Sequence, residues 1–558
     1  MYQVYPRSFC DSSGDGIGDI PGIISKLDYL RDLGFQTVWF SPFFRSPQRD
    51  FGYDVSDFRD IAPEYGSLAD VERLIREMHR RDMKILLDLV LNHTSDEHPW
   101  FLESRSSRNN PRRDWYVWRD GRGPAGRRPP NNWRSKVAGS GWHYDLATGQ
   151  WYWASFLAFQ PDLNYRNPEV RQTMLDTLRF WLERGVDGFR LDILGSLFED
   201  AEFRDNPPTW RFFPSVAEPD RFFRSTGMTE NHPDTLEFTR CLRALMDRYG
   251  DPPRFLVGEV FGGFPVLRRY CGGERPEGLH SVFLFRGMDT PLEARPLRRL
   301  IEEAERHFPE PFTPTWVFSN HDRMRRITVL GNNRKKARLN ALLQFTLRGI
   351  PCAYYGEEIG MQQGTPDFER ARDPLVSMVR GLSPFAQRLV YRYTRGVVDR
   401  DCCRLPMQWS SGASSGFCPA GTEPWLSVHE NHATVNVERQ TDQPDSLLSF
   451  YRRLLHLRKA HPELQGGHLE LIPASRLPRG VLAYRRCLPA AGSAQAGTAE
   501  GPGLRVYLNL GRRRTVIPLG AGGQRLFLST RQALIGESAS VLRGSCPVEP
   551  LEGIVIGP

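Results

Sequence analysis

Residues Gly185–Asp192, read Gly-Val-Asp-Gly-Phe-Arg-Leu-Asp, place an arginine and an aspartate two positions apart in a short apolar run. Alternate side chains of a strand share a face, so Arg190 and Asp192 are predicted to point the same way. An arginine beside a carboxylate keeps that carboxylate ionised and oriented, as a nucleophile requires. A structural ion pair is the alternative interpretation of these eight residues.

Further polar side chains stand at or just after the ends of other predicted strands. Barrels of parallel strands build their active sites at the carboxyl ends of those strands. Any one such residue could be an ordinary cap or loop residue, but several at equivalent places favour one shared site. Besides Arg190 and Asp192, the set comprises Tyr53, Asp54, Asn92, His93, Glu259, Asn320, His321 and Asp322.

This set matches what retaining glycoside hydrolysis needs. One carboxylate attacks the anomeric carbon, and a second, protonated carboxyl donates to the leaving oxygen. Asp192, held ionised by Arg190, suits the nucleophile. Glu259 suits the acid, because its apolar neighbours raise its pKa toward the working pH. The residues expected to hold sugar hydroxyls are Asp322, His93 and His321.

The elements that must position these residues alternate between strand and helix. The strands are nearly continuous apolar runs, which indicates burial on both faces and therefore a parallel sheet. Eight such units predict an α/β fold, the (β/α)₈ or TIM barrel. The predicted strands are 2–7, 37–41, 84–91, 188–192, 254–259, 281–285, 315–319 and 350–354.

Two long interruptions and a change of pattern divide the chain. A segment rich in Arg, Pro, Asn and aromatic residues follows strand three, and a Gly-rich, strand-like pattern follows a helix predicted at Ser446–Lys459. Residues 488–503 within that last pattern are predicted to form a surface loop. The expected division is a barrel at 1–94 and 164–465, with an insertion at 357–430 after strand eight, an inserted subdomain at 95–163 and a C-terminal β-sandwich at 466–558.

The run Asp11–Asp19 resembles the front of a calcium loop. Oxygen-bearing residues occupy positions 1, 3, 5 and 9 around a glycine at position 6. The bidentate Glu of a full EF-hand is absent, since Gly22 stands at position 12, so a turn rich in Asp and Gly is the alternative. The candidate ligands of a structural Ca²⁺ or Mg²⁺ are Asp11, Ser13, Asp15, the Ile17 carbonyl and Asp19.

Composition excludes several classes of protein. The net charge of +8 comes from scattered arginines rather than a basic stripe or tail, which argues against nucleic-acid binding. No run of 18 apolar residues exists and no signal peptide is visible, so no membrane association is expected. The nine cysteines show no Cys-x-x-Cys pair, which favours reduced thiols and a cytoplasmic protein. No organic cofactor is expected.

The motifs together resemble the α-amylase clan of glycoside hydrolases. Four runs resemble the four motif regions of that clan, in order: D-L-V-L-N-H (88–93), G-F-R-L-D (188–192), G-E-V (258–260) and F-S-N-H-D (318–322). Further runs resemble phrases of its α-glucosidase and oligo-1,6-glucosidase branch: Q-P-D-L-N (160–164), Y-Q-V-Y-P-R-S-F (2–9), N-H-T-S-D-E-H-P-W-F (92–101) and R-D-C-C-R-L-P-M-Q-W (400–409).

The resemblance implies Asp192 as nucleophile, Glu259 as acid/base and Asp322 as transition-state stabiliser. It also implies that Asp11–Asp19 is the branch's cation loop, although Ser13 stands where the branch usually has Asn, so binding should be weaker. The residues it implies around the non-reducing glucose are Tyr53, Asp54, His93, Arg190, His321 and Arg404.

The leading hypothesis is an exo-acting, retaining α-glucosidase of short oligosaccharides such as maltose and isomaltose. The long insertions are expected to close the pocket at one end. Ile193, which follows the nucleophile, is β-branched like the Val that the branch associates with 1,6-linkages. A transglycosylase or isomerase of the trehalose synthase or sucrose isomerase type would share every catalytic residue. A non-catalytic, transporter-associated heavy chain should show a membrane span and lack the acids.

Overall fold

The computed structural model describes residues 1–137, 139–212, 214–488, 503–531 and 541–558. Its centre is a closed barrel of eight parallel strands in the order β1-β13-β12-β11-β10-β9-β5-β2. The prediction of a (β/α)₈ barrel is therefore confirmed. The barrel strands are β1 (Tyr2–Val4), β2 (Thr37–Phe40), β5 (Lys84–Leu89), β9 (Gly188–Leu191), β10 (Phe255–Gly258), β11 (Ser281–Leu284), β12 (Thr315–Val317) and β13 (Ile350–Tyr354).

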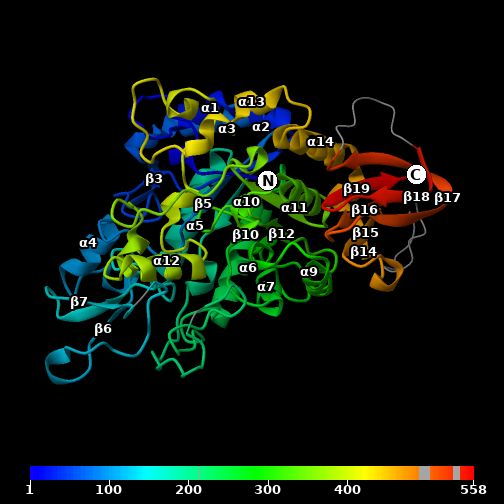
Figure 1. Ribbon diagram of the computed structural model, residues 1–558. Helices are drawn as coiled ribbons and strands as arrows, with labels where there is room; N and C mark the ends of the chain where they lie inside the picture. The colour runs from blue at the N-terminus through cyan, green and yellow to red at the C-terminus, as the bar shows by residue number, and fades with distance from the viewer. Residues whose placement is uncertain (138, 213, 489–502, 532–540) are drawn as a thin grey trace.

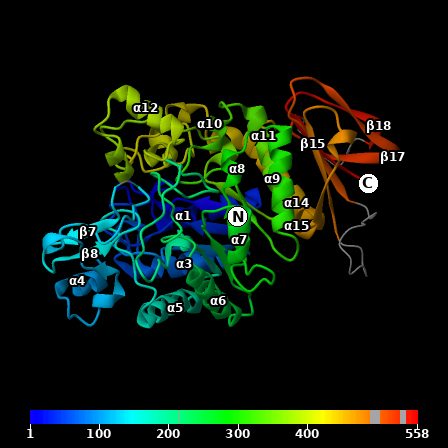
Figure 2. The ribbon, with the colours of Figure 1, turned by 90° about the horizontal axis from the view of Figure 1, so that it is seen from below.

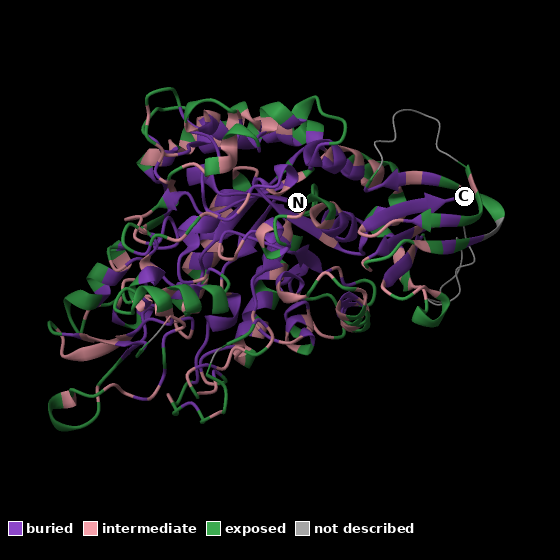
Figure 3. Ribbon diagram, viewed as in Figure 1, coloured by how far each residue is buried: buried purple, intermediate pink, exposed green. Residues whose placement is uncertain are grey.

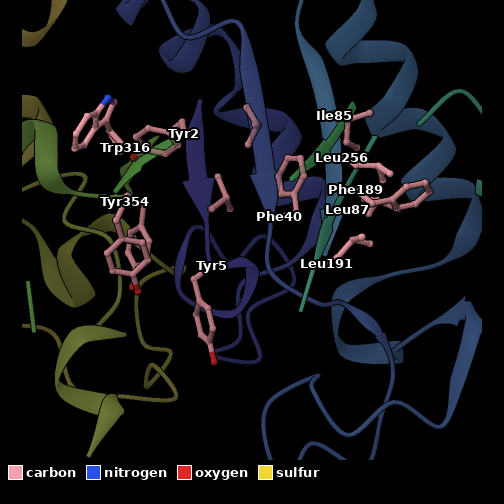
Figure 4. Close-up of a cluster of buried hydrophobic side chains, with 14 of the residues drawn as sticks. Tyr2, Tyr5, Phe40, Ile85, Leu87, Phe189, Leu191, Leu256, Trp316 and Tyr354 are labelled. Carbon is pink, nitrogen blue, oxygen red and sulfur yellow. The ribbon is translucent and has the colours of Figure 1, made fainter. Parts of the chain in front are cut away.

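Each of these strands lies inside a predicted one, and most are shorter at the ends. β1 stops at Val4 because Pro6, which has no N–H to donate, begins a 3₁₀ turn over Pro6–Ser8. Figure 4 shows outward-facing side chains such as Phe40, Leu87 and Phe189 packed toward the surrounding helices. Apart from the first residues of β2, β5, β10 and β13, the barrel strands are buried (Figure 3), as a parallel sheet covered on both faces requires.

The opposite faces of the same strands fill the barrel interior. Trp39, Leu86 and Val257 lie in one buried cluster there. In the strand register Asp88 of β5 pairs with Arg190 of β9, which in turn pairs with Val257 of β10. The side chains of Asp88 and Arg190 therefore point into the barrel. They lie between its apolar interior and the polar residues at the carboxyl ends of the strands.

Helices surround the barrel (Figure 2), and their apolar faces explain why. In α3 the Ser67–Asp70 capping box starts the helix, and Val71, Leu74 and Met78 bury one face at a spacing of three to four residues. The helices α1–α8 are Ile20–Ser25, Leu27–Leu33, Leu68–His79, Pro99–Ser106, Pro168–Glu183, Pro233–Asp247, Phe264–Tyr270 and Arg286–Asp289. The helices α9–α15 are Ala294–His307, Arg326–Val329, Arg334–Thr346, Pro384–Tyr393, Val437–Thr441, Leu447–Ala460 and Pro462–Gly466.

The segment 95–163 leaves the barrel after β5 and carries α4 and a three-stranded sheet. Its strands are β6 (Trp118–Arg119), β7 (Trp142–Asp145) and β8 (Gln150–Trp153), in the order β6-β8-β7. Trp133, Trp142 and Trp153 form its own small core. Figures 1 and 2 show this segment at the opposite end of the molecule from the C-terminal sheet. A separate pair, β3 (Phe44–Arg45) and β4 (Asp57–Ile61), follows β2.

The C-terminal part is an antiparallel sheet of six strands in the order β14-β15-β16-β19-β17-β18. These are β14 (His468–Leu471), β15 (Val481–Cys487), β16 (Leu504–Asn509), β17 (Thr515–Ser529), β18 (Val541–Val548) and β19 (Glu552–Gly557). This sheet corresponds to the β-sandwich predicted at 466–558, and hydrogen bonds join all six of its strands. Register shifts in β17 bend that sheet, so Ile517 packs across a shared core against Val481 and Ala483.

The other face of this sheet rests on the barrel. Tyr484 and Thr346 share a hydrogen bond of 2.5 Å between their hydroxyl groups. Gly553 lies so close to α11 that a Cβ there would meet Leu342 at 2.5 Å. The predicted surface loop at 488–503 lies almost wholly outside the described residues. In the part of the chain that the structure covers, no helix has the length and apolar character needed to cross a membrane.

Candidate active site

Asp192 and Glu259 stand side by side at the carboxyl end of the barrel. Each continues its strand: Asp192 N–H donates to Leu89 O at 3.1 Å, and Glu259 N–H donates to Leu191 O at 2.9 Å. The two carboxyl groups hydrogen-bond to one another, with Glu259 as the protonated partner. The barrel thus brings the predicted nucleophile and the predicted acid into direct contact.

Arg190 lies beneath this pair and is fully buried. Its Nη1 is 2.7 Å from Asp192 Oδ1 and 2.7 Å from Asp88 Oδ1, and its Nη2 contacts Glu259. Trp39 Nε1–H also donates to Asp88 at 3.1 Å. Three carboxyl groups therefore share Arg190, and its guanidinium orients both Asp192 and Glu259.

The pKa values of the two acids are displaced to different extents. Burial raises the pKa of Glu259 to about 8, against the opposing effect of Arg190 and with a further increase from the Asp192 charge. Burial also raises the pKa of Asp192 to about 6, although Arg190 lowers it. Between pH 6 and 8, Asp192 is therefore mainly a carboxylate and Glu259 mainly an acid, as the two roles demand.

Asp322 completes the set of acids on the far side of the mouth. Its Oδ1 accepts from Arg404 Nη2 at 3.0 Å and from Arg400 Nη1 at 3.3 Å. Burial alone would raise its pKa, but His321 and the two arginines hold it below the usual range. Asp322 is consequently ionised at every pH at which the enzyme would work.

His321 is held in one orientation from both sides. Gln3 Nε2 is 2.7 Å from its Nδ1, and the Tyr53 hydroxyl is 2.7 Å from its Nε2, with the Tyr53 and His321 rings stacked. With the Gln3 amide donating to Nδ1, the Nε2–H faces Asp322 Oδ2 at 3.2 Å. Burial lowers the pKa of His321 well below its usual value, so the ring is a neutral donor.

A pocket at the barrel mouth gathers most of the residues predicted for the site. The residues singled out in the sequence that line it are Tyr53, His93, Asp192, Ile193, Glu259, Asn320, His321 and Asp322. Arg190 and Arg404 lie behind this wall and contact the lining acids. Most of the residues expected to bind glucose therefore line the pocket. Arg190 and Arg404 are instead buried behind it and orient the lining acids.

Asp54 was predicted to contact glucose, but it is not among the residues that line the pocket. It accepts from Ser46 Oγ at 2.9 Å and from the backbone N–H groups of Arg49 and Asp50, both at 3.0 Å. These three donors tie together the loop that precedes Tyr53. Asp54 therefore shapes the loop, and it does not line the site.

Several polar residues that line the pocket were missed in the sequence, among them Asp50, Gln160 and Arg400. Asp50 pairs with Arg400 at 2.7 Å, and its second oxygen accepts from Gln160 Nε2 at 3.0 Å. The signal was present, since Arg400 and Gln160 open two of the runs that resemble the branch and Asp50 lies four residues before Asp54. Choosing between the two aspartates required the loop conformation, which the sequence pattern does not contain.

The predicted cation loop folds around its own backbone. Asp11 accepts from the N–H groups of Gly14 at 2.7 Å and Gly16 at 2.9 Å, and Asp19 accepts from Ser12 and Gly22. Within the described ranges, no cluster of three or more His, Cys, Asp or Glu side chains is placed to hold a metal ion. A cation bound at Asp11–Asp19 stays a prediction, and no catalytic role is assigned to it.

Comparison with known proteins identifies the family. Residues 3–467 match the alpha-amylase catalytic domain. The chain is 41% identical over 483 residues to a probable alpha-glucosidase of Rhizobium meliloti (strain 1021), covering 85% of this chain and 84% of that protein. It is 38% identical over 503 residues to an oligo-1,6-glucosidase of Parageobacillus thermoglucosidasius, covering 85% of each.

A solved structure is similar over the full length. The trehalulose synthase MutB from Pseudomonas mesoacidophila MX-45 superposes with a TM-score of 0.84 at 30% identity, covering 100% of this chain and 98% of that chain. These similarities confirm the resemblance predicted from the motifs. The chain belongs to the alpha-amylase family, and it is a glycoside hydrolase.

Proposed function

We propose that the protein is an exo-acting, retaining α-glucosidase that releases terminal glucose from short α-linked oligosaccharides. The observation that carries this proposal is the pair of hydrogen-bonded carboxyl groups, Asp192 and Glu259, whose pKa values of about 6 and about 8 separate their protonation states. A retaining mechanism needs one ionised and one protonated carboxyl group on the two sides of the scissile bond.

In the first step Asp192 attacks the anomeric carbon while Glu259 gives its proton to the leaving oxygen. The proton that Glu259 donates to Asp192 in the free enzyme is the one available for this transfer once a sugar separates the two groups. In the second step Glu259 takes a proton from water, which attacks the glucosyl–Asp192 ester. Asp322, kept ionised by its arginines, is placed to stabilise the positive charge of the transition state.

The exo-acting part of the proposal rests on how the inner end of the pocket is built. Arg400 bridges Asp50, Asp373 and Asp322, with Nη2 at 2.7 Å from both Asp50 and Asp373. Gln160 from segment 95–163 adds a hydrogen bond to Asp50. We expect these mutually paired groups to close the pocket beyond the terminal glucose, which would favour a chain end over an internal segment of a chain.

An isomerase or transglycosylase is the second candidate, and the similarity to trehalulose synthase MutB favours keeping it. Such an enzyme would form the same glucosyl–Asp192 ester but pass the glucose to a sugar hydroxyl instead of water. The difference lies in how long the first leaving group stays in the pocket. Both candidates therefore predict the same effects for substitutions of the acids and different products.

The test is product analysis on maltose, isomaltose, trehalose, sucrose and soluble starch. Glucose from the disaccharides with little from starch would support the α-glucosidase. Isomers of sucrose, or longer oligosaccharides, formed faster than glucose would support the isomerase or transglycosylase instead. Oligosaccharides released by internal cleavage of starch would refute exo action. Ile193, which lines the pocket beside Asp192 in a left-handed conformation (φ 30°), makes the maltose-to-isomaltose ratio informative about linkage.

A further inference from the structure

The pocket has a second charged feature that hydrolysis of neutral glucosides does not use. Three cationic side chains line it besides Arg400, namely Lys136, Arg221 and Arg323. We call them the cationic wall. They come from three separate segments: the 95–163 segment, the excursion that follows β9, and the loop that follows β12.

Charge pairing distinguishes this wall from the rest of the pocket. The acids around the glucose position all have buried arginine partners: Asp50 has Arg400, Asp322 has Arg400 and Arg404, and Asp192 and Glu259 have Arg190. Among the described residues, none of these four lining acids forms an ion pair with the cationic wall.

The wall itself is short of negative charge. Lys136 and Arg221 share one buried carboxylate, Glu230, with Lys136 Nζ at 3.9 Å and Arg221 in direct contact with the same oxygen. Arg323 is half-buried, and among the residues that the structure describes it has no ion pair and no side-chain hydrogen bond. A buried or half-buried cation without a counter-ion loses hydration without compensation, so such a group favours an anionic ligand.

The position of the wall points to the leaving group rather than to the glucose. Lys136 Nζ donates to Ser196 Oγ at 2.6 Å, four residues beyond the nucleophile, and lies 6.0 Å over the ring of Phe261, two residues beyond the acid. The excursion that carries Arg221 is anchored there as well, because Gly262 N–H donates to Val216 O at 2.9 Å. These contacts place Lys136 near Glu259, the residue that protonates the leaving group.

We propose that the cationic wall selects α-glucosides whose leaving group carries a negative charge, a carboxylate or a phosphate ester, with Arg323 and Lys136 as its ligands. This inference rests on the proposed function, because it names the substrate class of the same pocket. The anion forms charge-assisted hydrogen bonds with the wall and gives Arg323 the counter-charge that no described residue provides. The chemistry at Asp192 and Glu259 is unchanged.

The test compares substrates that differ in charge. Maltobionate and maltitol both carry glucose on an open-chain leaving group, and only maltobionate has a carboxylate; trehalose 6-phosphate and trehalose form the phosphate pair. The inference predicts that kcat/KM is about tenfold or more higher for the charged member of at least one pair, as one charge-assisted hydrogen bond would give. Whichever pair responds identifies the anion, and added salt should reduce the preference.

Variants assign the effect to the wall. Arg323→Gln should lower the charged-to-neutral ratio about tenfold, whereas Arg323→Lys, which keeps the charge, should hold the ratio within about threefold. The matched control is Arg306→Gln on α9, which removes an exposed charge from the outside of the barrel. Lys136→Gln is the second variant of the wall and should lower the same ratio.

Two outcomes would overturn the inference while leaving the proposed function intact: equal kcat/KM for charged and neutral members of both pairs, or a ratio that Arg323→Gln and Lys136→Gln leave unchanged. Hydrolysis of neither maltose nor maltitol, by contrast, would refute the proposed function itself. The neutral substrates thus separate the two failures.

Discussion

Replacing Glu259 by Gln removes the acid and keeps its shape. The amide can still donate to Asp192, so the pair beneath the sugar should stay in place. What disappears is the transferable proton, which in general acid catalysis contributes roughly 10²–10⁴-fold to the rate. We therefore expect kcat/KM for maltose to fall by roughly 10²–10⁴-fold.

The leaving group and the pH profile provide the controls. p-Nitrophenyl α-glucoside expels a stable anion that needs no proton, so formation of the glucosyl ester should be much less affected than with maltose. In the wild type, activity should fall below a pH of about 6, where Asp192 becomes protonated, and above about 8, where Glu259 loses its proton. The variant should lose only the upper of these two limbs, because Gln does not ionise.

The assays are initial glucose release from maltose and the pre-steady-state burst of nitrophenol, which reports ester formation before Glu259 is needed as a base, both between pH 4 and 10. Circular dichroism confirms that the variant is folded. Near-normal maltose hydrolysis by Glu259→Gln would refute the assignment of the acid. Equal losses with both substrates, or an alkaline limb that survives the substitution, would show that Glu259 acts through the shape of the site and not through its proton.

Three further predictions concern the support of the site and the cation loop. Arg190→Met leaves three buried carboxyl groups without their cation, so the free energy of unfolding should fall by about 3–5 kcal/mol in urea titration; a loss below about 1 kcal/mol would contradict its central role. Asp50→Ala unpairs Arg400 at the inner end of the pocket, and kcat/KM for maltose should fall at least tenfold, with unchanged kinetics contradicting a glucose contact. If Asp11–Asp19 holds a cation, a chelator should lower the Tm and excess Ca²⁺ should restore it. An unchanged Tm would refute a structural cation in this loop.

Much of the fold was predictable because burial leaves a strong pattern in the sequence. The eight barrel strands are mainly apolar runs, and each was found within its predicted range. The ends were less predictable: the chain leaves β1 at Val4 because Pro6 starts a turn. The joining of the C-terminal strands into one bent sheet depends on register shifts in β17, which no local pattern signals.

The site shows the same division between strand and loop. Asp192 and Glu259 were predictable since a strand end dictates where its next side chain points. Asp54 and Asp50 were not distinguishable, because both lie in a loop whose backbone decides which carboxylate caps it and which reaches the pocket. The role of Arg190 as the common partner of three acids depends on the alignment of β5 with β9 and was invisible in either strand alone.

The measurement that most directly tests the central claim is the anomeric configuration of the first glucose released from maltose, followed by proton NMR before mutarotation. Attack by Asp192 followed by attack of water inverts the anomeric carbon twice, so α-glucose should appear first and β-glucose only later. If β-glucose appeared first, a single displacement by water would be the mechanism. Asp192 would then act as a base and not as a nucleophile, which would contradict the proposed retaining mechanism.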